Sequence, residues 1–176
     1  MTTVKKSLLF FFICLFTVFL GACSEEPMGT TVLKHYPINS MEGVITRSRV
    51  EFDEEITADG DGSLRITVSK PFRVRLYETG DIDVKNARLI YQAKLRTEDV
   101  EGKVYIQMWC HFPGKGEYYS RAIQSALSGT NEWTSQEIPF FLTKKDNPDN
   151  IKFDVVLTGK GTVWVDDIKL IRAPLR

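Results

Sequence analysis

The sequence has 176 residues, with 23 basic and 23 acidic side chains, and its formal net charge is zero. This balance argues against the strongly basic surface that nucleic acids or a polybasic membrane patch would need. Of the three cysteines, Cys14 and Cys23 lie within or just after an N-terminal apolar run. Cys110 is therefore the only cysteine in the rest of the chain, which excludes an intramolecular disulfide there.

The N-terminal run is followed by a short motif of small residues. Lys5 and Lys6 precede the apolar residues 7–20, and the motif Leu20-Gly21-Ala22-Cys23 ends the run. The run is shorter than the roughly 20 residues of a comfortable membrane span. The pattern resembles the signal sequence and lipobox of bacterial lipoproteins, with an ordinary signal peptide or a transmembrane anchor as the alternatives.

The lipobox resemblance implies cleavage before Cys23 and a lipid on its thiol. That lipid would hold the protein at the membrane of a bacterial cell envelope. The outer membrane is expected, because Ser24 rather than Asp follows the cysteine. We therefore divide the chain into a signal peptide (1–22), a lipid-anchored tether (23–31) and one domain (32–176).

Short stretches of alternating apolar and polar residues follow one another along the domain. They predict strands at residues 64–69, 72–77, 87–96, 104–112, 133–142, 151–157 and 162–172. Clusters of Asp, Gly and Pro between them predict turns. Residues 125–130 read as a loop. Residues 87–96 and 104–112 read as the two strands of a hairpin, joined by a turn at 97–103.

The stretch 104–112 has two unusual faces. Val104, Ile106, Met108, Cys110 and Phe112 alternate with Tyr105, Gln107, Trp109 and His111. The first set predicts a core face, with Cys110 as a small buried residue rather than a reactive thiol. The second set predicts either an aromatic-polar binding surface or a second buried face beneath the segment 118–130.

The fold class that this pattern predicts is all-β. Many short strands with polar turns are typical of an antiparallel β-sandwich or barrel. No stretch has the long helical period that a crossover helix between parallel strands would show.

Three segments also resemble a known family. They are Asp61-Gly62-Ser63-Leu64-Arg65-Ile66, Asn131-Glu132-Trp133-Thr134 and the closing stretch Val155-Val156-Leu157-Thr158-Gly159-Lys160-Gly161-Thr162-Val163-Trp164-Val165-Asp166-Asp167-Ile168-Lys169-Leu170. They resemble, in order, the early turn, the late loop and the final hairpin of jelly-roll, galactose-binding-like domains, which include cellulose- and xylan-binding modules. The resemblance implies a jelly-roll sandwich that binds carbohydrate without catalysis, although this fold serves many functions.

We identify the glycan-binding residues from the predicted face and its neighbouring strand. A sugar site would combine aromatic rings, which stack on the C–H face of a pyranose, with amides and guanidinium groups that bind hydroxyls. The candidates are Tyr105, Gln107, Trp109, His111, Arg88 and Gln92. The alternative is that Trp109 is covered and packs in the core, as we expect for Trp133 and Trp164.

The family resemblance also implies a structural calcium ion. Asp166 or Asp167 of the last strand is the candidate ligand, with Glu51 or Asp53 of an early strand, and we favour Asp166 and Asp53. Calcium needs about six to eight oxygen ligands. The sequence offers only scattered acids, and a turn or solvated role is the alternative for each.

Two other functions remain as alternatives. No nucleophile motif or phosphate loop occurs, and the only histidines are His35 and His111. A pair of carboxylates for glycoside hydrolysis is compatible with the composition, yet no two acids stand out. An aromatic face could also bind an envelope protein, because Tyr and Trp are enriched at interface hot spots.

Overall fold

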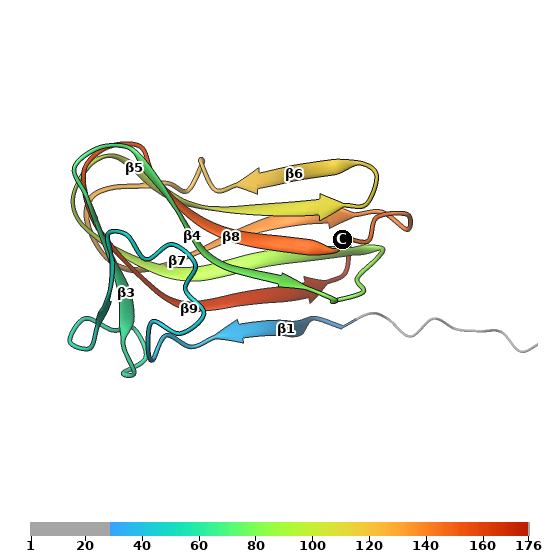
Figure 1. Ribbon diagram of the computed structural model, residues 1–176, viewed down its shortest axis with the longest axis horizontal. Helices are drawn as coiled ribbons and strands as arrows, with labels where there is room; N and C mark the ends of the chain where they lie inside the picture. Colours follow the sequence, from blue (N-terminus) through green and yellow to red (C-terminus); the bar gives the residue numbers. More distant parts are fainter. Residues whose placement is uncertain (1–28, 176) are drawn as a thin grey trace, which may run out of the picture.

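The computed structural model describes residues 29–175 and is built from β-strands (Figure 1). Within this range no helix is long and apolar enough to cross a membrane. Cys23 lies outside the described residues, and so does the whole predicted signal peptide. The strands are β1 (Thr31–Tyr36), β2 (Val50–Asp53), β3 (Ser63–Val68), β4 (Phe72–Gly80), β5 (Ala87–Phe112), β6 (Gly116–Arg121), β7 (Leu127–Leu142), β8 (Asn150–Leu157) and β9 (Gly161–Ala173).

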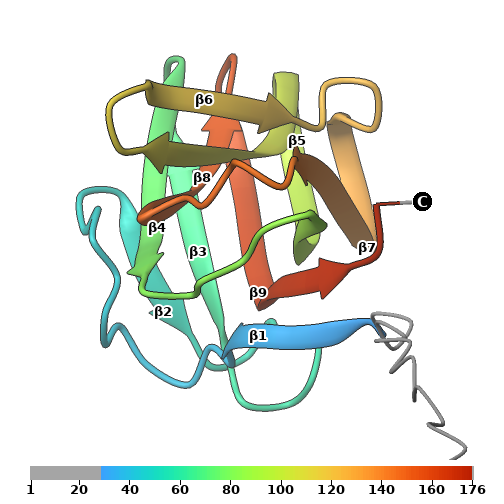
Figure 2. The same ribbon diagram turned by 90° about the vertical axis from the view of Figure 1, so that its right-hand side faces the viewer.

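All strand pairs are antiparallel, and the sheet curls into two layers that form a β-sandwich. The first layer holds β2, β3, β9, the beginning of β5, and β7, with β1 paired to the second half of β9. The second layer holds β4, β8, the end of β5, and β6. Both views place β1 and β6 on opposite sides of the molecule (Figure 1, Figure 2). The predicted all-β sandwich is thus confirmed.

The predicted hairpin between residues 87–96 and 104–112 is wrong. β5 is one strand of 26 residues that passes from the first layer to the second. It bends between Asp99 and Gly102, which have positive φ angles of 49° and 100°. Strands that change sheets bend at such points. Glycine is needed at position 102, because a Cβ there would lie 2.9 Å from the Thr158 hydroxyl.

The core lies between the layers and follows the predicted alternation. Along the end of β5, Val104, Ile106, Met108, Cys110 and Phe112 are buried. Burial raises the pKa of the Cys110 thiol to about 12, as its apolar neighbours predict. Tyr91 of the first layer packs edge-on against Phe153 of the second, with ring centroids 5.0 Å apart.

Two segments that the sequence left as loop or unassigned are strands. Residues 118–121 belong to β6, and β7 already begins at Leu127, so the loop predicted at 125–130 is wrong. Polar residues are common in this stretch because β7 is exposed along one face. The local composition therefore gave little strand signal.

Candidate functional site

The outer face of the second layer carries aromatic and charged side chains in rows across four strands. One row runs from Glu78 through Lys152 and Trp109 to Tyr119. The next row places Arg75, Asp154, Gln107 and Arg121 side by side. Below, the term aromatic-polar face means the residues Arg73, Arg75, Tyr105, Gln107, Trp109, His111, Glu117, Tyr119, Arg121, Lys152 and Asp154.

Trp109 and Tyr119 form the aromatic part of this face. Their ring centroids are 4.8 Å apart with the planes inclined at 49°. The Arg73 guanidinium lies 5.8 Å from the centre of the indole ring, and Arg121 lies 5.4 Å from the centre of the Tyr119 ring. Trp109 is half-buried and Tyr119 is exposed. The two rings therefore form a partly open apolar platform with guanidinium groups beside it.

A buried ion pair lies on the same face, in the row next to Trp109. The Asp154 carboxylate is fully buried, and Oδ1 accepts a hydrogen bond of 2.9 Å from Arg75 Nε. Arg73 Nε lies 3.7 Å from the other carboxylate oxygen. Burial alone would lower the pKa of Arg75, but its contacts with Asp154 and Glu78 outweigh this and raise the pKa. The guanidinium is thus charged and held in one position.

The rim of the face is made of further ion pairs. Lys152 Nζ donates a hydrogen bond to Glu117, and this contact lowers the pKa of the Glu117 carboxyl. His111 Nδ1 lies 2.5 Å from Asp149 Oδ1. These contacts fix polar groups next to the two rings. A surface that is ordered before a ligand arrives loses less entropy on binding.

The segment 118–130 extends the sheet and does not lie across the face. Its first part is β6, which pairs with β5 alongside Trp109. Ala122 N then donates to the Ile106 carbonyl, and Gln136 bonds both Ile106 N and the Ser125 carbonyl. The connector between β6 and β7 is therefore fixed at the edge of β5. This leaves the rings of the aromatic-polar face uncovered by that segment.

Two of the expected binding residues are less accessible than predicted. Tyr105 and Gln107 are only 7% and 6% exposed, although they belong to the same face as Trp109. In register, Gln107 is flanked by Asp154 and Arg121. The side chains of these two residues are thus nearly closed to solvent, whereas Trp109 and His111 are half-buried and can be reached from solvent.

Arg88 and Gln92 do not lie beside Trp109, because the hairpin that would bring them there does not form. They belong to the beginning of β5 and point outward from the first layer. Arg88 is in register with Phe141 and Ala173, and Gln92 with Glu137 and Lys169. The structure therefore places the six predicted glycan-binding residues on two different faces.

The predicted metal ligands hold the segment 53–58 against β9. Asp53 accepts hydrogen bonds from Trp164 Nε1 and from the backbone N–H groups of residues 55 and 56. Asp166 accepts from the N–H groups of Ala58 and Asp167. All four carboxylate oxygens thus face N–H donors, which does not fit a calcium site. No group of three metal-binding side chains occurs among residues 29–175, and calcium binding stays a prediction.

Sequence reasoning missed the residues of the face that come from other strands. Tyr119 lies in the segment that the sequence left unassigned. The sequence pattern predicts only ordinary solvent-facing positions for the other missed residues, which are Arg73, Arg75, Lys152 and Asp154. Alternation places each of them opposite the core. The neighbour relations β4–β8–β5–β6 depend on pairings between distant segments, which alternation alone does not give.

Comparison with known proteins identifies the fold. No protein-family model matches the sequence, and the comparison with curated proteins finds no match. A family 16 carbohydrate-binding module superimposes with a TM-score of 0.58 at 16% identity, over 80% of this chain and 99% of that one. The CBM22-1 xylan-binding domain from Paenibacillus barcinonensis Xyn10C gives 0.61 at 12% identity, over 83% and 97%.

A third structure is longer than this chain. The CBM22-1–GH10 modules of Clostridium thermocellum Xyn10B, complexed with xylohexaose, give a TM-score of 0.60 at 12% identity, over 80% of this chain and 28% of that one. At such identities the likeness establishes the fold alone. The chain has the β-sandwich fold of carbohydrate-binding modules.

Proposed function

We propose that this protein binds a polysaccharide through the aromatic-polar face, without catalysis. The observation that carries this proposal is the pair of neighbouring rings, Trp109 and Tyr119, on an open sheet face beside ordered guanidinium and carboxylate groups. Aromatic rings offer flat apolar surface to the C–H face of a sugar ring. The charged groups beside them are available to bind its hydroxyls.

The names of similar structures support a polysaccharide as the ligand class. The Paenibacillus domain is described as xylan-binding, and the Clostridium modules were obtained with xylohexaose. Low sequence identity prevents a transfer of the particular sugar. The aromatic-polar face of this chain spans the four strands β4, β8, β5 and β6. This width suits a chain of linked sugars better than a single small molecule.

The carboxyl groups on this face are unsuited to acid–base catalysis. Glycoside hydrolysis needs a carboxylic acid whose pKa is raised so that it can donate a proton. Asp154 is ion-paired with Arg75, and the pKa of Glu117 is lowered by Lys152. Asp166 is the described carboxyl whose pKa is raised, chiefly by burial, and it lies in the first layer bonded to backbone N–H groups. These features favour binding over hydrolysis.

The lipobox resemblance supplies the location in this proposal. A lipid on Cys23 would hold the domain at the bacterial cell envelope. The outer membrane is the proposed location, because Ser24 rather than Asp follows the cysteine. The sequence around Cys23 supports this assignment, and mass spectrometry of the purified protein tests it directly. A mature N-terminus at Cys23 with a diacylglyceryl mass is the expected result.

Neighbouring tyrosines on β6 provide a matched test of the binding face. Tyr118 and Tyr119 are 52% and 49% exposed, but Tyr119 is in register with Trp109, whereas Tyr118 is in register with core residue Cys110. We expect Tyr119→Ala to weaken retention on an insoluble polysaccharide panel and Tyr118→Ala to leave it near wild type.

Two outcomes would contradict the proposal. One is that neither polysaccharides nor oligosaccharides retain the folded protein. The other is that the Tyr119→Ala and Tyr118→Ala variants bind alike. Capture of an envelope protein that persists in excess glycan would instead support the alternative, in which the same rings form a protein interface.

A further inference from the structure

An apolar row crosses the outer face of the first layer, opposite the aromatic-polar face. Val32 of β1, Ile171 of β9, Ile90 of β5 and Pro139 of β7 are in register with one another. Val32 is 51% exposed, and Pro139 is also exposed. Outer faces of sandwich sheets ordinarily carry polar residues. An exposed apolar row of this kind therefore indicates an interaction surface for a protein, a membrane or a ligand.

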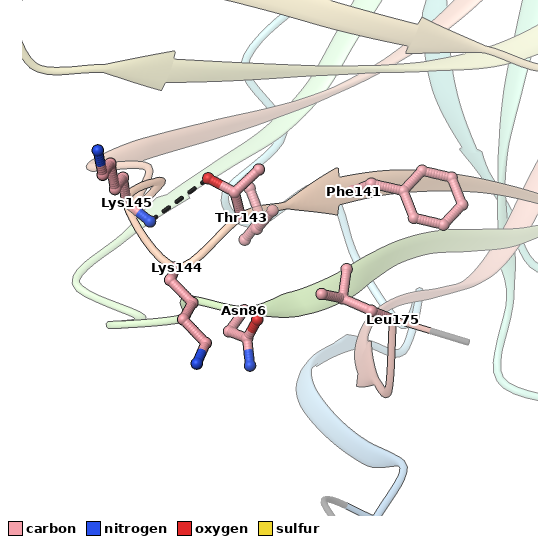
Figure 3. Close-up of a pocket in the computed structure, with 7 residues that line it drawn as sticks. Asn86, Phe141, Thr143, Lys144, Lys145 and Leu175 are labelled. Atoms are coloured by element: carbon pink, nitrogen blue, oxygen red, sulfur yellow. Dashed lines mark hydrogen bonds between the residues drawn. The ribbon is translucent and has the colours of Figure 1, made fainter.

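Toward the end of the sheet, the next row on this face holds Arg88 of β5 in register with Phe141 of β7. Phe141, which is 57% exposed, follows Pro139 on the same face of β7, and Leu175 lies close to it. Figure 3 shows both side chains at one end of a shallow depression, with Lys144 and Lys145 at its other end. We call Val32, Ile90, Pro139, Phe141, Ile171 and Leu175 the docking face.

Charged residues lie at one end of the docking face and along one of its sides. Neither Lys144 nor Lys145 forms an ion pair with another described residue. On the other side of the apolar row, the next row is polar, and it contains Glu137, Gln92, Lys169 and His35. Apolar side chains with unpaired lysines at one end are the combination that binds the surface of an anionic bilayer.

β1, which contributes Val32 to the docking face, begins eight residues after the predicted lipidation site Cys23. β1 begins at Thr31, in register with Arg172, at the end of the sheet where Ala87 pairs with Leu142. A fully extended chain from Cys23 to Thr31 spans at most about 29 Å. A lipid on Cys23 would therefore keep the docking face close to the membrane.

We propose that the docking face lies on the surface of the anionic bilayer that holds the lipid anchor. This inference rests on the lipid anchor of the proposed function. Because the two layers have their outer faces on opposite sides, this orientation directs Trp109 and Tyr119 away from the membrane. The sandwich thus presents its binding face to polysaccharide outside the bilayer.

Site-specific labelling of the lipidated full-length protein tests this orientation. Bimane is attached at Leu175→Cys, in the docking face, or at Glu78→Cys, in the outer face of β4. Cys110 is buried and does not compete for the label. The protein is reconstituted in vesicles of phosphatidylethanolamine and phosphatidylglycerol that contain doxyl-labelled lipid.

We expect a blue shift and strong quenching of the label at position 175 and little change at position 78. Lys144→Glu combined with Lys145→Glu should reduce the quenching. Lys70→Glu combined with Lys103→Glu makes the same charge change at exposed lysines elsewhere and should leave it unchanged. Equal quenching at positions 175 and 78 on vesicles that carry the protein would overturn the proposal.

Flotation of the vesicles and polysaccharide retention separate this proposal from the binding function. A protein that fails to float with the vesicles lacks the anchor, and the orientation is then wrong even if polysaccharide still retains the protein. A protein that floats, shows quenching at position 175 and binds no polysaccharide supports the orientation and contradicts the binding function.

Discussion

The buried Asp154–Arg75 pair is expected to support the aromatic-polar face. Asp154→Asn keeps the shape of the side chain and removes its charge. Two unit charges about 4 Å apart interact with about 4 kcal/mol at an effective dielectric constant near 20. Removing one partner of a buried pair usually costs about 3–5 kcal/mol. Because the Arg75 side chain is 23% exposed, water compensates part of this loss. We expect the free energy of unfolding to fall by about 2–4 kcal/mol.

Urea denaturation of the wild type and the Asp154→Asn variant measures this change, provided that both have the same m-value. Arg75→Leu combined with Asp154→Val removes both charges and serves as the second variant. The double variant should lose less stability than the sum of the losses in the single variants Arg75→Leu and Asp154→Val, because no uncompensated charge stays buried in it. A loss below about 0.5 kcal/mol in Asp154→Asn, the size of an ordinary surface substitution, would refute the role of the pair.

The remaining predictions concern the core, the pH response and calcium. Cys110, with its pKa raised to about 12, should resist a thiol reagent at pH 8 until the protein unfolds, and rapid labelling of the native protein would contradict its burial. Burial alone would raise the pKa of Asp53, but hydrogen bonds from Trp164 and the backbone lower it. Its stabilising contribution should be present above about pH 4 and be lost as the pH falls through the lowered pKa. Asp53→Asn should flatten this acid-side loss in melts from pH 5 to pH 2. Because the carboxylate oxygens of Asp53 and Asp166 already accept N–H hydrogen bonds, we expect the melting temperature to be indifferent to calcium and EDTA, and a rise with calcium would instead support a calcium site there.

Alternation along the chain gave the two sides of most strands correctly. It placed Met108 and Cys110 in the core and Trp109 and His111 on the opposite face, because side chains of a strand alternate whatever its partners are. Alternation also placed Arg88 and Gln92 on an outer face, but the predicted hairpin failed, and with it their position beside Trp109. Continuity of β5 through Asp99 and Gly102 depends on how the two layers pack, whereas the local sequence of charged residues and glycine is typical of a turn.

The width of the candidate site could not be predicted for a related reason. Tyr119 and Lys152 reach Trp109 through pairings with strands that lie later in the chain. Such pairings are set by the whole sheet, and single-strand periodicity contains no information about them. The sequence also overestimated the access to Tyr105, which is 7% exposed, because alternation gives the face of a residue and not the side chains that surround it there.

Intrinsic tryptophan emission during titration with a retained, soluble polysaccharide tests the central claim most directly. Trp133 and Trp164 lie in the first layer, and Trp109 is the tryptophan of the aromatic-polar face. We predict a saturable change in emission that Trp133→Phe preserves and Trp109→Phe abolishes. Trp109→Ala should weaken binding by about 2 kcal/mol, roughly thirtyfold in Kd. An emission change that survives in Trp109→Phe, or wild-type affinity in Trp109→Ala, would contradict the assignment of this face as the binding site.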